Sequence, residues 1–299
     1  MLLLDGGVGT ELQRRGAAMD PAAWCGPATL QNDALLTEIH VDYARAGSDV
    51  ITANTFASSR VMLAAAGYGD HVAELNTRAV EAALRAQAQL ADEGRIVAVA
   101  GSLSHLMPMI PGTATVDRSL VPSADAVGAA FVEVAQLVKD AGAEVILLEM
   151  MYEPERAALA VEATLGVGLP VWFGLSARRG AAGEAVSFHH FDEVPLAELA
   201  RLIPATGIDV AGVMHTPSEL MSDALRVVRN HFAGPLSAYP DSGHFEMPGW
   251  SFVDIIDPAV LERFYLAWLE QGARVLGGCC GLTIPHIEAA ARARAAWAA

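Results

Sequence analysis

Short apolar runs rich in β-branched residues alternate with Ala-rich segments of helical periodicity along the whole chain. Two parallel strands need a crossover of a dozen or more residues between them, and a helix usually supplies it. Regular alternation of this kind is therefore typical of an α/β fold with a parallel sheet. The apolar runs cover residues 2–7, 49–56, 96–104, 144–150, 170–177, 209–216, 235–243 and 273–281.

Three of the helical segments end in a glycine directly before the next run, in "RAGSDV", "DAGAEV" and "EQGARV". Glycine is the common residue just past a helix. Eight strands alternating with eight helices favour an α/β fold of one domain over residues 1–299, a single (β/α)8 TIM barrel. The expected helices cover residues 33–47, 70–93, 124–142, 154–166, 193–203, 217–232, 258–271 and 285–298.

A doubly wound open sheet is the alternative fold, and it would need a phosphate-binding fingerprint. The stretch "DGGVGTEL" (residues 5–12) resembles a Gly-rich phosphate loop only loosely. It lacks the Lys-Ser/Thr pair of a Walker loop, and no acidic partner of a dinucleotide site follows it. A tight turn between a strand and a helix explains the glycines equally well.

The charge balance restricts the partners. The formal charge is −16, and 53% of the 299 residues are hydrophobic. This charge repels phosphate backbones and anionic lipid, so we expect neither nucleic acid nor membrane partners. We also expect no spanning helix, because no apolar stretch reaches about 18 residues. The start, "MLLLDGGVG", has no basic segment and reads as a strand of the fold. A homo-oligomer stays possible.

Only three cysteines occur, Cys25, Cys279 and Cys280. An odd count with two adjacent members is a poor disulfide framework. It suits a reducing cytoplasm, where clustered thiols are more often metal ligands or catalysts, so we expect a cytoplasmic protein. Cys25 has no partner nearby in the sequence and is expected to be a buried thiol.

Chemically versatile side chains follow the predicted strands. In a barrel, the C-terminal ends of the strands share one face, and active sites are built there. Loops are polar in general, but two carboxylates, an imidazole and two thiols gathered on one face indicate a functional site. The residues at or just past the strand ends include Asp5, Asn54, Glu149, His215, Cys279 and Cys280.

His215 and the pair Cys279–Cys280 are candidate metal ligands. Two thiolates and an imidazole form a soft set that favours Zn²⁺ and leaves a fourth position open. The glycines around the pair permit the sharp turn that two adjacent ligands need. The alternative is that both thiols are buried as small hydrophobic groups and His215 caps a helix. Other histidines compete for the third ligand position: His105, His189, His190 and His244.

Six stretches together resemble the homocysteine S-methyltransferase family. They are "DGGVGTEL", "TANTF", "GS" after the third run, "LLEM", "YPDSG" and "GGCCGLTIPHI", and they extend over essentially the whole chain. The resemblance implies a (β/α)8 barrel with zinc held by three cysteines, of which Cys279 and Cys280 match the adjacent pair.

The chain departs from the family pattern at the third ligand. The family usually has "G-[IV]-N-C" here, whereas this sequence has "GVMH", with Met214 at the asparagine and His215 at the cysteine. Asp241 also stands where the family commonly has asparagine. Two thiolates and a neutral imidazole leave a zinc site at charge zero instead of −1. We expect this to change the reactivity of a bound thiol, and Asp241 to offset part of the difference.

The resemblance implies zinc-dependent transfer of a methyl group from a sulfonium or ammonium donor to the thiolate of homocysteine or a related thiol. S-methylmethionine is the first choice of donor, followed by S-adenosylmethionine or a betaine. Asp5 and Glu149 match carboxylates that hold the ammonium group of the acceptor. We expect Gly6, Asn54 and Thr55 to bind substrate beside them.

Aromatic rings could stabilise a cationic donor, with Trp24, Phe56 and Tyr152 as candidates. Two other functions stay open. One is a zinc-dependent lyase or hydrolase on the same barrel, with Glu149 or Asp241 as base. The other is a non-catalytic family member that has lost zinc.

Overall fold

The computed structural model describes residues 1–113, 115–189, 191–247 and 250–298. Eight parallel strands are hydrogen-bonded in the order β1-β11-β8-β7-β5-β4-β3-β2. A bridge between Leu4 and Val50 joins the first strand of this path to the last, so the predicted barrel is confirmed. The strands are β1 (Leu2–Leu3), β2 (Val50–Thr52), β3 (Ala98–Ser104), β4 (Val145–Met151), β5 (Val171–Arg179), β7 (Val210–Pro217), β8 (Leu236–Asp241) and β11 (Ala273–Leu276).

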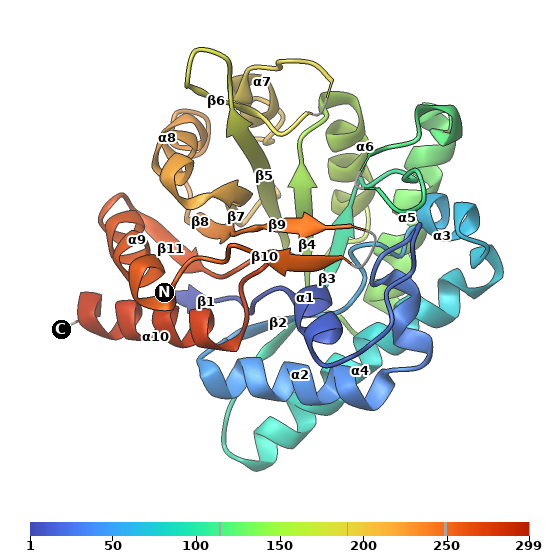
Figure 1. Cartoon of the computed structure of the whole chain (residues 1–299), viewed down its shortest axis with the longest axis horizontal. Helices are drawn as coiled ribbons and strands as arrows, with labels where there is room; N and C mark the ends of the chain where they lie inside the picture. Colours follow the sequence, from blue (N-terminus) through green and yellow to red (C-terminus); the bar gives the residue numbers. More distant parts are fainter. Residues whose placement is uncertain (114, 190, 248–249, 299) are drawn as a thin grey trace.

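Helices surround the ring of strands (Figure 1). The eight expected helices are present as α2 (Asp33–Ala46), α4 (Val72–Asp92), α5 (Ala124–Asp140), α6 (Pro154–Leu165), α7 (Leu196–Ala200), α8 (Ser218–Arg229), α9 (Pro258–Glu270) and α10 (Ile284–Ala298). The helix α7 has five residues, fewer than the expected range 193–203, because it begins only after Pro195. Short helices absent from the sequence prediction are α1 (Val8–Arg14), α3 (Arg60–Ala65) and the 3-10 turns Gly26–Leu30, Gly69–His71 and Arg118–Leu120.

Three further strands lie outside the barrel. Strand β6 (Ala185–Ser187) pairs antiparallel with the end of β5. Strands β9 (His244–Glu246) and β10 (Ser251–Val253) pair with each other. This hairpin, orange in Figure 1, crosses the face of the barrel in that view. The hairpin was not among the elements expected from the sequence.

Apolar side chains fill the barrel below the site. A buried cluster inside the ring includes Leu4, Val50, Ala100, Val145, Val210 and Val275. A larger cluster lies between the strands and the helices. None of the helices among the described residues is long and apolar enough to cross a membrane.

Candidate metal centre and substrate pocket

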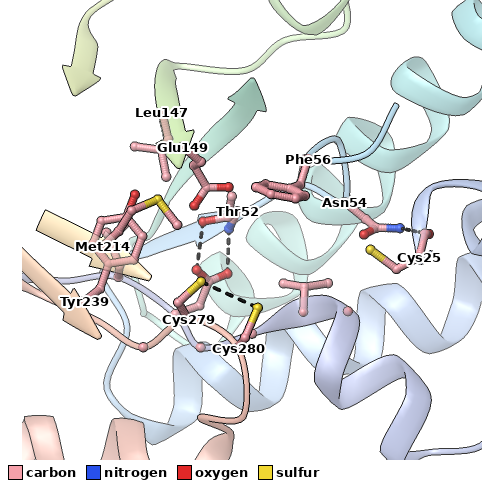
Figure 2. Close-up of a pocket in the computed structure, with 18 of the residues that line it drawn as sticks. Cys25, Thr52, Asn54, Phe56, Leu147, Glu149, Met214, Tyr239, Cys279 and Cys280 are labelled. Atoms are coloured by element: carbon pink, nitrogen blue, oxygen red, sulfur yellow. Dashed lines mark hydrogen bonds between the residues drawn. The ribbon is translucent and has the colours of Figure 1, made fainter. Parts of the chain in front are cut away.

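One pocket lies at the C-terminal ends of the barrel strands. It brings together four of the predicted substrate-binding residues, Asp5, Gly6, Asn54 and Glu149, with both members of the cysteine pair. Figure 2 shows the sulfurs of Cys279 and Cys280 side by side near Glu149 and Thr52. Other residues that line the pocket include Trp24, Cys25, Phe56, Leu147, Met214 and Tyr239.

His215 completes a cluster of three ligand atoms. Its Nδ1 atom lies 3.6 Å from the Cys279 sulfur, and the two sulfurs of the pair lie 3.8 Å apart. The three ligand atoms all lie within 4.8 Å of one another. In the part of the chain that the structure describes, this is the group of His, Cys, Asp and Glu side chains close enough to share one metal ion.

The backbone of β7 bends to bring His215 into the cluster. In a regular strand, successive side chains alternate between the two faces. Val213 packs toward the helices and Met214 toward the barrel interior, so His215 would point outward like Val213. The register of β7 on β8 shifts between Met214 and Pro217, and His215 has a left-handed φ of 42°. This conformation is uncommon for a residue with a Cβ, and such strain is frequent at functional sites.

The cysteine pair is anchored by backbone hydrogen bonds to β8 and the residue after it. The Cys279 N–H donates to the Pro240 carbonyl at 2.7 Å, and the Ser242 N–H donates to the Cys280 carbonyl at 3.0 Å. Gly281 follows with a φ of 78°, which only glycine adopts without strain. A Cβ there would lie 2.1 Å from the Ser242 carbonyl oxygen. The glycine is therefore what lets two adjacent cysteines face one point.

The electrostatics of the cluster favour a bound cation. The neighbouring Cys280 thiol and burial raise the pKa of Cys279 well above its usual value, although His215 opposes them. Burial lowers the pKa of His215, but Asp241 and Cys279 outweigh it and raise the pKa to about 9. Thiolates at this depth need positive charge beside them, and a metal ion provides it.

Asp5 lies buried at the end of β1 and accepts two hydrogen bonds from one residue of β2. The Thr52 N–H donates to it at 2.6 Å and the Thr52 hydroxyl at 2.7 Å. Burial raises the pKa of Asp5 to about 7, against the opposing effect of these bonds. A cationic group in the pocket would favour the ionised form.

Glu149 points into the same pocket from β4. Its carboxylate accepts a hydrogen bond from the Ser102 hydroxyl. Burial raises the pKa of Glu149 to about 7, opposed by Ser102 and reinforced by the negative charge of Asp5. The next residue, Met150, has a φ of 54°, and its N–H lies 2.8 Å from the Met214 sulfur. Two carboxyl groups therefore share one pocket that contains no arginine or lysine among its described lining residues.

Two predicted substrate contacts have structural partners instead. The Thr55 hydroxyl donates to the Ser102 carbonyl at 2.7 Å and accepts the Ser102 N–H at 2.9 Å. Thr55 does not line the pocket, so the pocket geometry gives its predicted role in substrate binding no support. The Asn54 amide donates to the Cys25 carbonyl and the Thr29 hydroxyl, at 2.9 and 3.1 Å. Asn54 lines the pocket and also holds the segment that carries Trp24 and Cys25.

The other histidines lie away from the cluster. His105 is buried and its Nε2 accepts the Tyr152 N–H at 3.2 Å. The Nδ1 of His189 accepts the Asp192 N–H at 2.9 Å. The side chain of His244 is 61% exposed. His190 lies outside the described residues. Among the histidines that the structure describes, His215 is therefore the one that joins the cysteines.

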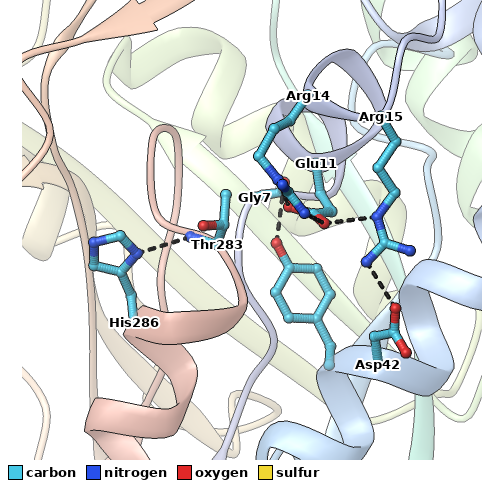
Figure 3. Close-up of polar contacts among 8 residues, drawn as sticks. Gly7, Glu11, Arg14, Arg15, Asp42, Thr283 and His286 are labelled. Atoms are coloured by element: carbon cyan, nitrogen blue, oxygen red, sulfur yellow. Dashed lines mark hydrogen bonds and ion pairs between the residues drawn. The ribbon is translucent and has the colours of Figure 1, made fainter.

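The glycine loop at residues 6–7 lies beside a group of polar contacts on α1 and α2, and the Tyr43 hydroxyl donates to the Gly7 carbonyl at 3.3 Å (Figure 3). Burial alone would raise the pKa of Glu11, but Arg14 and Arg15 outweigh it and hold the pKa below its usual range. The Arg15 guanidinium also bonds Asp42 of α2 at 2.7 Å. These contacts tie α1 to α2, and a Cβ at Gly6 would lie 2.6 Å from the Leu282 carbonyl oxygen. The loop is a tight turn between a strand and a helix, the alternative that explained its glycines equally well.

The "TIPHI" stretch after the cysteine pair has a structural role as well. The Thr283 N–H donates to His286 Nδ1 at 3.1 Å, and His286 Nε2 lies 2.9 Å from the Ile256 carbonyl oxygen. His286 therefore ties the start of α10 to the segment after β10, and it takes no part in the metal cluster.

Aromatic rings form one wall of the pocket. Trp24 meets Phe56 edge to face at a centroid distance of 6.0 Å, and both line the cavity. Phe245 and Trp250 of the hairpin pack on Trp24 at 6.0 and 6.1 Å. Tyr152, the third aromatic candidate, packs against His105 at 4.4 Å and is absent from the pocket lining.

Sequence reasoning missed Leu147 and Met214 as pocket residues. Leu147 stands two residues before Glu149 on β4, so strand alternation places both on the same face and could have identified it. For Met214, the sequence showed only that it replaces the family asparagine. Regular alternation from Val210 places Met214 on the interior face as well, before the register of β7 shifts.

The chain is similar to known methyltransferases over nearly its whole length. A model of the homocysteine S-methyltransferase family matches residues 2–294. A homocysteine S-methyltransferase of Escherichia coli (strain K12) is 28% identical over 297 residues, which cover 97% of this chain and 94% of that protein. A selenocysteine methyltransferase of Astragalus bisulcatus is 25% identical over 313 residues, covering 94% of this chain and 88% of that protein.

The fold is also similar to that of a homocysteine methyltransferase whose structure has been solved. The metallated form of the Escherichia coli homocysteine methyltransferase MmuM superposes with a TM-score of 0.76 at 25% identity, covering 98% of this chain and 96% of that one. Its apo form superposes with a TM-score of 0.71 at the same identity. Since the family match runs from the first barrel strand into the last helix, the chain belongs to the homocysteine S-methyltransferase family, a family of methyltransferases.

Proposed function

We propose that the protein is a zinc-dependent thiol S-methyltransferase that transfers a methyl group from a small sulfonium donor to homocysteine or a closely related thiol. The observation that carries the proposal is the convergence of His215, Cys279 and Cys280 on one point, with both cysteines lining the same pocket as the carboxyl groups of Asp5 and Glu149. The family match and the relatives that act on homocysteine and selenocysteine support it.

The spacing of the three ligand atoms supports zinc. With Zn–S bonds of about 2.3 Å and a Zn–N bond of about 2.0 Å, a tetrahedral ion separates two sulfurs by about 3.8 Å and a sulfur and a nitrogen by about 3.5 Å. In the structure, the two sulfurs lie 3.8 Å apart, and the Cys279 sulfur lies 3.6 Å from His215 Nδ1. Two thiolates and an imidazole also suit zinc better than magnesium or calcium, which prefer oxygen ligands.

Three protein ligands leave one tetrahedral position for the acceptor. Zinc bound here would favour the thiolate form of the acceptor, so that no general base is needed. The chain's own residues would bind and orient the acceptor beside this position. Asp5 and Glu149 would hold its ammonium group, and Gly6 lines the same pocket beside them. The buried floor of the barrel would exclude water from the thiolate.

The methyl donor would approach from the aromatic wall. Trp24 and Phe56 present rings to the cavity, and a sulfonium group gains about 0.5–2 kcal/mol from such a ring when it is desolvated. The thiolate would attack the methyl carbon in line, the bond from that carbon to the donor sulfur would break, and its electron pair would stay on that sulfur. S-methylmethionine is the donor that we propose first, because the pocket is small. With homocysteine as the acceptor, the demethylated donor and the methylated acceptor are then both methionine.

The two alternative functions lack a specific observation in their favour. A zinc-dependent lyase or hydrolase would need a base beside an activated water, and the family match favours methyl transfer instead. A family member without zinc would leave unexplained why a left-handed His215 brings its Nδ1 atom to 3.6 Å from the Cys279 sulfur.

A matched pair of thiol variants tests the proposal. The purified protein should contain about one zinc per chain and should methylate homocysteine with S-methylmethionine. Cys280→Ser should lose both zinc and activity, whereas Cys25→Ser should keep both. Cys25 lines the same pocket but lies outside the metal cluster, and burial raises its pKa to about 12. A wild-type protein that binds no zinc, or a Cys280→Ser variant with full activity, would refute the proposal.

A further inference from the structure

Asp241 lies against the nitrogen ligand of the candidate metal centre. It is the last residue of β8 and pairs in register with Pro217, just past the bulge that carries His215. Its Oδ2 atom lies 3.6 Å from His215 Nδ1, and their side chains are 17% and 10% exposed. The same Nδ1 atom lies 3.6 Å from the Cys279 sulfur. The bulge therefore brings an acidic side chain to the edge of the cluster.

The surroundings of Asp241 offer no other cation. Within the described ranges, His215 is the one basic side chain at ion-pair distance from it, while the nearby Glu219 is acidic. A largely buried carboxylate is costly unless a positive charge lies beside it. A protonated His215 can supply this charge in the metal-free protein, and zinc bound at Nδ1 would supply it in the loaded protein.

The formal charge of a zinc site here depends on Asp241. Two thiolates and a neutral imidazole balance the charge of Zn²⁺, and the carboxylate then brings the total to −1. Three thiolates around the same ion would also give −1. His215 and Asp241 are the positions where the family pattern has cysteine and commonly asparagine, and the structure places these two departures in contact.

We propose that His215 and Asp241 function as one unit, in which the Asp241 carboxylate supplies the negative charge that a third thiolate would give. Asp241 is a positioning residue: its carboxylate lies beside Nδ1, the candidate ligand nitrogen of His215, and acts on the site by its charge without touching the reacting atoms. Added negative charge makes the site hold a cation more tightly and keeps a thiolate acceptor more nucleophilic. This inference rests on the proposed function, because it requires zinc at the cluster.

The test is a double-mutant cycle on zinc affinity, measured by competition with a chromophoric chelator. The four proteins are the wild type, Asp241→Asn, His215→Cys and the double variant. In the histidine background, Asp241→Asn should weaken zinc binding about 10- to 100-fold, the usual range for partners of metal ligands. In the cysteine background the same change should cost less than about 3-fold, since a third thiolate already supplies the charge. Equal losses in both backgrounds, or no loss in either, would overturn the inference.

Two controls keep the outcome decisive. Glu219→Gln removes an exposed carboxylate near Asp241 and should leave zinc affinity unchanged. Asp241→Glu keeps the charge and should recover most of the affinity lost in Asp241→Asn, a comparison that decides the matter even if His215→Cys fails to fold. A wild-type protein without zinc would refute the proposed function. If the wild type binds zinc and transfers the methyl group, but the effects of the two substitutions on zinc affinity are additive, the proposed function stands and this inference alone is refuted.

Discussion

Asp5→Asn should change how the stability of the substrate-free protein depends on pH. Asp5 is buried, and its pKa is raised from 3.8 to about 7, chiefly by burial. The folded protein thus binds this proton more tightly than the unfolded chain does. The stabilisation is fully present below the unfolded pKa of about 4 and is lost as the pH rises through about 7.

The size of the effect follows from the two pKa values. Between pH 5 and pH 8, the unfolded chain has already released the proton while the folded protein releases it only near pH 7. Linkage then gives a loss of about 3 kcal/mol in the free energy of unfolding over this range. Asparagine does not ionise, and its amide can still accept the Thr52 N–H. Wild type should therefore lose about 3 kcal/mol more than Asp5→Asn.

Urea denaturation at pH 5 and pH 8 measures this difference directly. The metal ligands are common to both proteins, so their own titration cancels in the comparison. Homocysteine should stabilise the wild type at pH 8, because its ammonium group pairs with the ionised carboxylate, and should stabilise Asp5→Asn far less. Identical pH dependence in the two proteins, or equal stabilisation by homocysteine, would contradict both the burial argument and the assigned role of Asp5.

Three substitutions test other parts of the pocket. Phe56→Leu should raise the KM of the sulfonium donor about 2- to 30-fold and leave that of the acceptor unchanged, as steady-state kinetics with each substrate varied would show; an equal rise in both would contradict the aromatic wall. Thr55→Val should lower the free energy of unfolding by about 1–3 kcal/mol, because it leaves the buried Ser102 N–H without an acceptor, with no change in either KM; a selective loss of acceptor binding would contradict its structural role. Gly6→Ala should reduce kcat/KM about 100-fold, because its Cβ would meet the Leu282 carbonyl oxygen at 2.6 Å and displace the loop; near-normal kinetics would show that the loop position is unimportant.

Much of the fold could be predicted because it depends on local pattern. Alternating apolar runs and helical segments indicate a barrel from sequence alone, and the order of the strands confirms it. The motifs around Asp5 and the cysteine pair predicted the family, and the match over residues 2–294 confirms that too. The hairpin β9–β10 and the short helices were missed, since segments of three to seven residues carry little periodicity.

The site could be predicted only in part. Strand ends share one face of a barrel, so Asp5, Glu149 and the cysteines were expected to lie close together. The orientation of His215 could not be derived, because in a regular strand it would point away from the pocket. A bulge and a left-handed residue reverse it, and both depend on tertiary packing against β8. Thr55 was assigned to the pocket for lack of any sign that its hydroxyl pairs with Ser102.

X-ray absorption at the zinc edge, with and without homocysteine, tests the central claim most directly. We expect a ligand shell of two sulfurs and one nitrogen from the protein, with a third sulfur added when homocysteine is present. Selenohomocysteine should give the same change with a heavier scatterer, which identifies the new ligand as the acceptor. An unchanged shell in the presence of a saturating thiol, or a shell without sulfur, would contradict the account.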